Sequence, residues 1–322
     1  MIAHSGEYRK KNGQRGYVMM NNFIFENKTK VYFGKGGVKE YLGGLLANFG
    51  ETVMLAYGGG SIKCNGVYDE IMGILNAAGK RVVEFSGIMS NPTYQKVQDG
   101  AKLARENHVD LILAVGGGSV SDCCKVISGA FDTLSHAMET YFGKPDENNL
   151  SDDINEAAMR SVIRNIRILL TDPENYDARS ELAWASAMAE NGVLKIGKVT
   201  DFQAHQIEHQ LGAYTNCNHG AVLAVIHPVL YRHIYKSGAA RFARFAQNVW
   251  GIAPKGSDGE TAACIDALAA FIKEIGLPTS FAELGIPADT DFRAIADSTN
   301  VTAGCCKKLT HDEIYEILQE CL

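Results

Sequence analysis

The 322-residue sequence predicts an α/β domain with a parallel sheet, followed by an all-helical domain. Up to about residue 128, short β-rich runs alternate with helical periods, which is typical of strand-helix-strand units. Beyond that point, apolar residues recur at helical spacing and β-branched runs nearly vanish. We therefore expect a disordered tail or upstream extension over 1–19, an α/β domain over 20–128 and a helical domain over 129–322. The junction between 128 and 129 is the only candidate linker.

Individual elements follow from apolar periodicity and turn signals. Because a helical pattern follows each of three buried strands, these strands should run parallel in one sheet. The three strands are predicted over 53–56, 81–85 and 111–115, with a preceding pair of strands over 23–33. Helices of the second half are predicted over 132–141, 151–170, 178–189, 202–211, 221–234, 259–275 and 311–321.

The composition argues against several classes of function. The net charge is −6 and the basic residues form no stripe, which disfavours nucleic-acid binding. The longest apolar stretches, 111–115 and 221–226, fall far short of the roughly 20 residues that a membrane-spanning helix needs. Eight cysteines without a CxxC pair, and no apolar run behind the basic N-terminus, favour a reducing compartment over secretion. We therefore expect a cytoplasmic protein with no nucleic-acid or membrane partner.

Two glycine triplets, each followed by serine, stand at the ends of predicted strands. They are Gly58-Gly59-Gly60-Ser61 and Gly116-Gly117-Gly118-Ser119. Backbone N–H groups at a strand-to-helix turn can bind phosphate, and glycine lets the phosphate approach closely. Neither triplet is the GxGxxG fingerprint, and each alone could be no more than a tight turn. Because both should lie at the same edge of the sheet, the pair favours a dinucleotide-binding site.

The helical half contains a pattern of metal-type side chains. Asp132 and His136 are four residues apart, which places both on one face of a helix. His205 and His209 repeat that spacing, and His219 follows at a predicted helix start. A lone histidine is more often a hydrogen-bonded core or surface residue, but the joint pattern favours a metal site. Mixed carboxylate and imidazole ligands suit Fe²⁺ or Zn²⁺, whereas Mg²⁺ and Ca²⁺ favour oxygen-only sites.

Four stretches of the sequence match a known family. They are YGGGSIK at 57–63, GGGSVSD at 116–122, FDTLSHAME at 131–139, and HQIEHQLG at 205–212 with NHG at 218–220. With them the chain resembles the iron-containing, or group III, alcohol dehydrogenases over nearly all of 20–322, and most of all their NADPH-dependent butanol dehydrogenase branch. The resemblance implies that Asp132, His136, His205 and His219 are metal ligands, with iron more expected than zinc. It implies that His209 is a non-ligand histidine that helps to move the alcohol proton to solvent.

The resemblance also implies a nicotinamide cofactor between the two halves. The loop from Gly116 to Ser119 looks like the pyrophosphate cradle, and the loop from Gly58 to Ser61 would lie at the adenosine ribose. The sequence has no acidic residue in the latter loop, where a carboxylate would repel a 2′-phosphate, so NADP is favoured over NAD. Further candidate contacts of the cofactor are Asn91 and Asp122.

The activity implied by the resemblance is hydride transfer between NADP(H) and primary alcohols or aldehydes such as butanol and butanal, and the family makes a homodimer plausible. One departure is large: family members continue for several dozen residues after the second glycine loop and its helix, whereas here 124–128 runs straight into 129–132. That missing block includes a Gly-Thr-Gly-Ser-Glu-like phosphate and nicotinamide loop. A truncated, non-catalytic metal-binding relative is therefore an alternative. A lyase of the dehydroquinate synthase type ranks lower, because the Asp132 and His136 pair looks like the dehydrogenase pattern.

Overall fold

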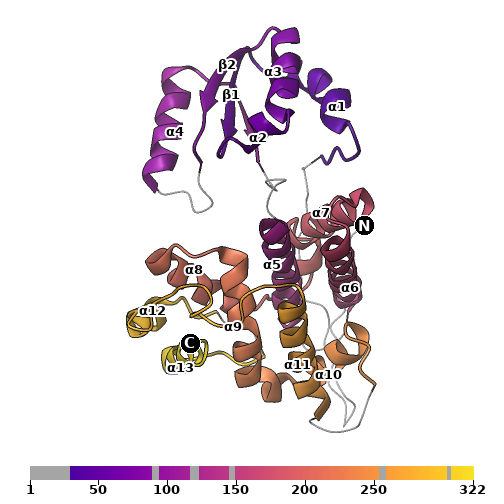
Figure 1. Cartoon of the computed structure of the whole chain (residues 1–322), viewed down its shortest axis with the longest axis vertical. Helices are drawn as coiled ribbons and strands as arrows, with labels where there is room; N and C mark the ends of the chain where they lie inside the picture. Colours follow the sequence, from indigo (N-terminus) through magenta and orange to yellow (C-terminus); the bar gives the residue numbers. More distant parts are fainter. Residues whose placement is uncertain (1–29, 89–93, 117–122, 145–148, 254–258, 303–305) are drawn as a thin grey trace, which may run out of the picture.

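A computed structural model describes residues 30–88, 94–116, 123–144, 149–253, 259–302 and 306–322. In Figure 1 the strands and the first four helices form the upper part of the molecule, and the later helices form the lower part. This arrangement confirms the predicted fold class, an α/β part with a parallel sheet and a helical part. Nowhere in the described ranges is a helix both long enough and apolar enough to cross a membrane.

The sheet has three parallel strands in the order β2-β1-β3. Its strands are β1 (Thr52–Tyr57), β2 (Arg81–Phe85) and β3 (Leu111–Val115). Helices of this part are α1 (Gly37–Leu46), α2 (Ser61–Cys64), α3 (Val67–Ala77) and α4 (Tyr94–Glu106). The central strand β1 is buried along its whole length, and its apolar side chains join those of α1 and α3 in one hydrophobic cluster. The predicted parallel strands are thus confirmed within one residue at each end.

The helical part has its own, separate hydrophobic cluster, which contains residues from Ala130 to Cys321. Its long helices are α5 (Cys123–Tyr141), α6 (Leu150–Thr171), α7 (Tyr176–Glu190), α8 (Gln203–Thr215), α9 (His219–Ile234), α11 (Gly259–Glu274) and α13 (His311–Glu320). Its other helices are η1 (Val193–Lys195), η2 (Tyr235–Gly238), α10 (Ala239–Asn248) and α12 (Phe292–Ser298). Helix α5 packs against α6, α7 and α9, and so lies at the centre of this part.

Two predictions about the chain's layout differ from the structure. The predicted linker at 128–129 lies inside α5, which runs without a break from Cys123 to Tyr141. Helical hydrogen bonding therefore continues through Gly129, although glycine is a poor helix former. Residues 30–33 form no strand, and the rest of the strand pair predicted over 23–33 lies outside the described residues. The tail over 1–19 also lies outside them, and the domain limits at 20–128 and 129–322 remain a prediction.

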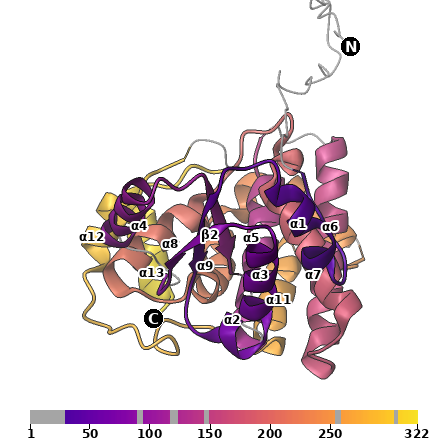
Figure 2. The same ribbon diagram turned by 90° about the horizontal axis from the view of Figure 1, so that it is seen from above.

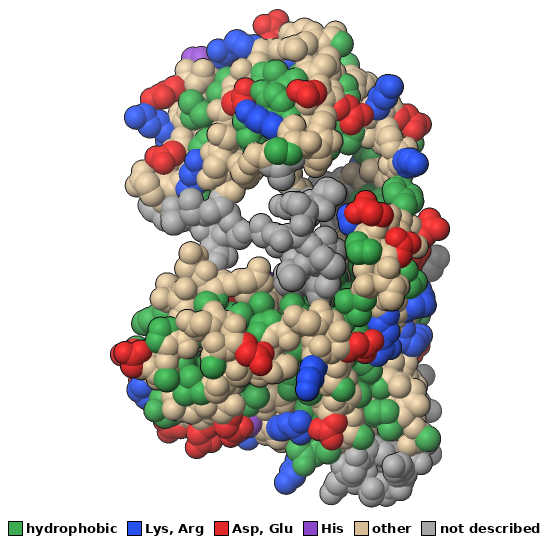
Figure 3. Space-filling view, viewed as in Figure 1, with side chains coloured by type: hydrophobic (Ala, Val, Ile, Leu, Met, Phe, Trp, Pro, Cys, Tyr) green, Lys and Arg blue, Asp and Glu red, His purple; other side chains and the backbone are tan. Residues whose placement is uncertain are grey.

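Viewed from above, the sheet part lies over the helical part, near α5, α8 and α9 (Figure 2). On the face shown in Figure 3, Lys and Arg side chains are interspersed with Asp and Glu over both parts. The carboxyl ends of β1 and β3 point toward the helical part, as Figure 1 shows for the sheet as a whole. Gly58 and Gly116, the first residues after these two strands, therefore lie at the sheet edge that is nearer the helical part.

Aromatic packing under α5 should dominate the stability of the helical part. Phe242 is fully buried and stacks on Phe142 with ring centroids 4.2 Å apart. We expect Phe242→Ala to lower the free energy of unfolding by about 3–5 kcal/mol, because it leaves a cavity in a close-packed core. Tyr214→Ala, at an exposed α8 position, should change it by about 0.5 kcal/mol or less. Urea unfolding, followed by the fluorescence of Trp184 and Trp250, measures the free energy of unfolding of both variants. Equal losses in the two variants would contradict this view of the core.

Candidate metal centre

One face of α5 carries three polar side chains. Asp132, His136 and Glu139 follow one another at helical spacing, so they lie along one side of the helix. Glu139 is fully buried, whereas Asp132 and His136 are partly exposed. Helix α5 therefore presents two carboxylates and an imidazole to the helices that pack on it.

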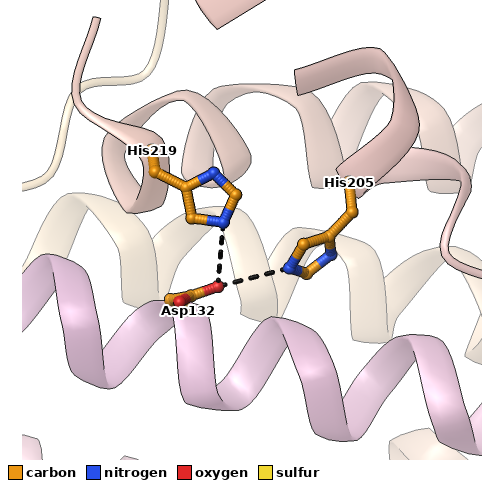
Figure 4. A group of neighbouring side chains, drawn as sticks. All are labelled: Asp132, His205 and His219. Atoms are coloured by element: carbon orange, nitrogen blue, oxygen red, sulfur yellow. Dashed lines mark ion pairs between the residues drawn. The ribbon is translucent and has the colours of Figure 1, made fainter. Parts of the chain in front are cut away.

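Helices α8 and α9 place the other two histidines of the predicted ligand set. Phe202 precedes α8 with a left-handed backbone (φ 57°), and His205 lies in the first turn of that helix. Asn218 caps α9 by accepting a hydrogen bond from the backbone N–H of Ala221, which makes His219 the first residue of the helix. The two imidazoles thus reach the α5 face from two different helices (Figure 4).

Three of the four predicted ligands converge on one point, and the fourth, His136, lies beside them. Asp132 Oδ1 is 3.3 Å from Nε2 of His205 and 3.3 Å from Nε2 of His219 (Figure 4). His136 Nε2 is 3.7 Å from the same oxygen. Ligand atoms that lie about 2.1 Å from one tetrahedral ion are about 3.4 Å apart. Asp132, His205 and His219 offer ligand atoms that all lie within 4.8 Å of one another, and His136 stands directly beside this group.

The polar atoms at the centre of the group fit a cation. Asp132 Oδ1 and His205 Nε2 are both buried, and neither has a hydrogen-bond partner among the described residues. Buried polar atoms without a partner are rare, because burial removes their hydrogen bonds to water and no protein group replaces them. Here two of them face each other across 3.3 Å, and a divalent ion would satisfy both.

Two further carboxylates hold the histidine rings, and the sequence analysis assigned neither of them a role. Glu139 Oε2 pairs with Nδ1 of His205, and Glu208 Oε2 pairs with Nδ1 of His219. Each pair leaves Nε2 of the ring directed at Asp132, which is the orientation that ligating histidines usually receive from an outer carboxylate. A signal was present in the spacing, since Glu139 lies seven residues after Asp132 and Glu208 three residues after His205.

The charges around the centre shift the pKa of its groups. Burial would raise the pKa of Asp132, but its contacts with His205 and His219 hold it well below the usual range. Burial would lower the pKa of both histidines, but neighbouring carboxylates raise it to about 9 for His205 and about 10 for His219. Burial and the charge of His205 lower the pKa of His136 to about 4. The two carboxylate-bound imidazoles thus carry at neutral pH the positive charge that a cation would replace.

His209 lies beside the ligand group and faces solvent. Its ring stacks on that of His219 with centroids 5.6 Å apart, and 57% of its side chain is exposed. Glu208, His209 and His219 also offer atoms at ligand spacing, but Glu208 already pairs with Nδ1 of His219. Burial lowers the pKa of His209. His209 is therefore placed as a neutral imidazole between the group and bulk water.

The glycine loops leave the sheet side by side. Gly58 and Gly116 directly follow Tyr57 and Val115, which pair with each other in the parallel register of β1 and β3. A Cβ atom added at Gly59, Gly60 or Gly116 would meet nothing within 4 Å, so these three positions face open space, whereas one at Gly58 would lie 3.1 Å from the backbone oxygen of Ile88. Ser61 begins the four-residue helix α2. The other predicted cofactor contacts lie outside the described residues: Asn91, Gly117, Gly118, Ser119 and Asp122.

Known proteins are similar to this chain in sequence and fold. NADH-dependent butanol dehydrogenase B of Clostridium acetobutylicum is 28% identical over 385 aligned positions, which cover 93% of this chain and 98% of the relative. The NADPH-dependent aldehyde reductase YqhD of Escherichia coli is 27% identical, with 83% of this chain and 90% of the relative covered. The crystal structure of NADH-dependent butanol dehydrogenase A from Thermotoga maritima superposes with a TM-score of 0.87 and 27% identity, covering 94% of this chain and 99% of that one.

Family models match both parts of the chain. The model of iron-containing alcohol dehydrogenases matches residues 28–158, and the model of the C-terminal part of the Fe-containing alcohol dehydrogenase family matches residues 126–322. The second match alone spans more than half of the chain and includes all four predicted ligands. The chain belongs to the iron-containing alcohol dehydrogenase family.

Proposed function

We propose that this protein transfers hydride between NADP(H) and primary alcohols or aldehydes such as butanol and butanal, at a metal centre held by Asp132, His136, His205 and His219. The observation that carries the proposal is the convergence of Asp132, His205 and His219 on one point, where the ligand atoms of Asp132 and His205 are buried and have no hydrogen-bond partner among the described residues. An alcohol dehydrogenase or aldehyde reductase activity agrees with the family. The substrate, the metal and the preference for NADP are our proposals.

The ligands have distinct tasks in this scheme. When bound, a divalent ion would supply Lewis-acid polarisation of the substrate oxygen, and the nicotinamide would exchange the hydride. Asp132 contributes the negative charge among three imidazoles, which favours Fe²⁺ first and Zn²⁺ second. Glu139 and Glu208 fix the rings of His205 and His219 through Nδ1, so that Nε2 of each stays directed at the centre.

His209 is the proposed route for the alcohol proton. It is a neutral imidazole in contact with the His219 ring, and more than half of its side chain is exposed. Such a group can accept a proton on the inner side and release one to water on the outer side. The hydride and the proton would therefore leave the alcohol in different directions, toward the cofactor and toward solvent.

The preference for NADP rests on the loop from Gly58 to Ser61, which contains no carboxylate to repel a 2′-phosphate. The names of the relatives include both NADH-dependent and NADPH-dependent enzymes. We place the adenosine ribose at this loop and the pyrophosphate at Gly116 to Ser119. Asn91 and Asp122 complete the proposed cofactor site, and a homodimer is the proposed assembly.

A second candidate function is metal binding without hydride transfer. The 385 aligned positions of the Clostridium relative exceed the 322 residues of this chain, so that relative has residues without a counterpart here. We place the loss after residue 128, where the family sequence would continue with its second phosphate loop. A chain that lacks this loop would keep the metal ligands but hold nicotinamide poorly.

Activity distinguishes the two candidates. NADPH oxidation with butanal should be measurable in the iron-loaded protein, should be lost after chelation and should return with added Fe²⁺. Asp132→Asn should lower kcat/KM by about a hundredfold or more, because it removes the only negative ligand of the four. Stoichiometric metal binding with neither NADPH binding nor oxidation would support the second candidate. Full activity without metal would contradict both the metal centre and the mechanism.

Glu208 should matter for metal affinity although it is not one of the proposed ligands. We expect Glu208→Gln to weaken Zn²⁺ or Co²⁺ binding by about 10- to 100-fold, since the His219 ring loses its charged partner. Glu316→Gln, at an exposed α13 position, is the matched control and should bind metal like the unaltered protein. Competition with a chromogenic chelator measures the metal affinity of both variants. Equal affinity in the two variants would mean that Glu208 does not orient a ligand.

Metal affinity should rise with pH through the neutral range. The ion must displace a proton from His205, whose pKa is about 9, and one from His219, whose pKa is about 10. Below these values both rings are protonated, so affinity should fall by up to about a hundredfold for each pH unit of acidification. Chelator competition between pH 6.0 and 8.0, with the number of released protons taken from calorimetry in several buffers, tests this. Release of no proton at pH 7 would overturn the assignment of these two ligands.

A further inference from the structure

Ser135 and His227 form a buried contact between helices α5 and α9, and the scheme above gives it no role. Ser135 Oγ and Nε2 of His227 share a hydrogen bond of 2.6 Å, and both side chains are fully buried. Nδ1 of His227 has no hydrogen-bond partner among the described residues, so within that part of the chain the ring bonds to Ser135 alone. The contact therefore ties one imidazole of α9 to one position on α5.

This contact lies on the turns of α5 that carry two of the proposed ligands. Ser135 directly precedes His136 and follows Asp132 by three residues. The ring of Phe131, which directly precedes Asp132, meets the ring of His227 edge-on, with centroids 6.1 Å apart. His227 thus contacts α5 at Phe131 and at Ser135, one turn apart, on either side of Asp132 in the sequence.

On α9 the contact is a polar point in an apolar face. In this helix, which is described over its whole length, only His227 and Tyr231 among the buried residues have polar side-chain atoms. Pro228 follows His227 and has no N–H, so the helix lacks one backbone hydrogen bond at this place. Apolar faces can pack in several positions, whereas a polar pair buried between them is satisfied only where its two atoms meet. The pair therefore selects one position of α9 on α5.

We propose that Ser135 and His227 are positioning residues of the metal centre. Their hydrogen bond sets where α9 lies on α5, and thereby holds Nε2 of His219 at the carboxylate of Asp132. This inference rests on the metal centre proposed above. His219 lies eight residues before His227, about 12 Å along the axis of α9. A shift or rotation of α9 at the contact would therefore change the 3.3 Å spacing between His219 and Asp132. The pair acts through these two ligands and does not touch the ion.

A purely structural role is the alternative, in which the pair contributes to stability and nothing more. Removing one partner leaves the other polar atom buried and unsatisfied, which destabilises the fold, whereas replacing both with apolar side chains removes that cost. The double variant Ser135→Ala with His227→Leu should therefore unfold at a urea concentration close to that of the unaltered protein. If the pair only stabilises the fold, the double variant should recover metal binding together with stability.

The experiment uses Co²⁺ as the probe, bound to the whole chain under anaerobic conditions. We expect the double variant to bind Co²⁺ about tenfold or more weakly than the unaltered protein, because the two ligands are no longer held in one geometry. Its visible d–d bands at saturating Co²⁺ should differ from those of the unaltered protein, a change that a loss of stability alone does not produce. If the double variant does not fold, Ser135→Ala, which removes a single oxygen atom, is measured in its place with the same expectation.

Two further variants serve as controls. His227→Gln places an amide within reach of Ser135, so it should keep more of the Co²⁺ affinity than His227→Leu. Tyr231→Phe removes a buried hydroxyl one turn further along α9, which has no hydrogen-bond partner among the described residues, and should change neither affinity nor spectrum. An unchanged affinity and spectrum in the double variant would overturn the inference, and so would equal changes in the double variant and in Tyr231→Phe.

The same measurements separate this inference from the proposed function. If the unaltered protein binds no Co²⁺, or if Asp132→Asn binds it with the same affinity and spectrum, the metal centre itself is wrong and the positioning role falls with it. If Asp132→Asn loses binding while the double variant keeps the affinity and spectrum of the unaltered protein, only the positioning role is wrong. The four-ligand centre would then stand.

Discussion

The buried contact of Glu139 with the start of α8 is the interaction on which the rest of the site depends. One oxygen of this carboxylate accepts a hydrogen bond from the backbone N–H of Ala204, and the other pairs with Nδ1 of His205. A fully buried carboxylate is tolerated only when it is paired and hydrogen-bonded. The pairing therefore fixes how α8 docks on α5 and, through the same side chain, which nitrogen of His205 faces Asp132.

That constraint explains why the centre keeps unsatisfied atoms. Nδ1 of His205 and Nδ1 of His219 are both occupied by carboxylates, so only their Nε2 atoms are available for a ligand. The buried atoms Asp132 Oδ1 and His205 Nε2 remain without hydrogen bonds although each lies close to the other. A fold selected for stability alone would remove such atoms or pair them. In the scheme proposed above, a bound cation would satisfy both atoms.

The sequence could predict those features that follow from local pattern. The strands β1 and β3 and the i, i+4 pairing of Asp132 with His136 are visible in spacing alone, and the resemblance added His205 and His219 as ligands. Helix α12 was missed because its seven residues give too little periodicity, whereas α10 was missed although its ten residues have a clear amphipathic period.

The unpredicted parts of the site depend on packing between helices. Glu139 and Glu208 could be noticed on helix faces, but their partners are set by how α8 and α9 dock. The contact between His136 and Glu190, the last residue of α7, is also set by helix packing, so no spacing in the chain predicts it. The expected linker at 128–129 was wrong because a change in composition need not coincide with the end of a helix.

The continuity of α5 bears on the proposed loss of residues after position 128, which lies inside this helix. The second glycine loop and Asp122 directly precede this helix, and Asp132 follows nine residues after its first residue, about 14 Å along its axis. The helix thus fixes the distance from its own first residue, which follows the proposed cofactor loop in the sequence, to the first of the proposed metal ligands. The two hydrophobic clusters are separate, so residues could be lost between them without disturbing the packing that holds the ligands. In the proposed scheme such a loss would remove contacts with the cofactor and leave the metal ligands in place, so metal binding and hydride transfer must be measured independently.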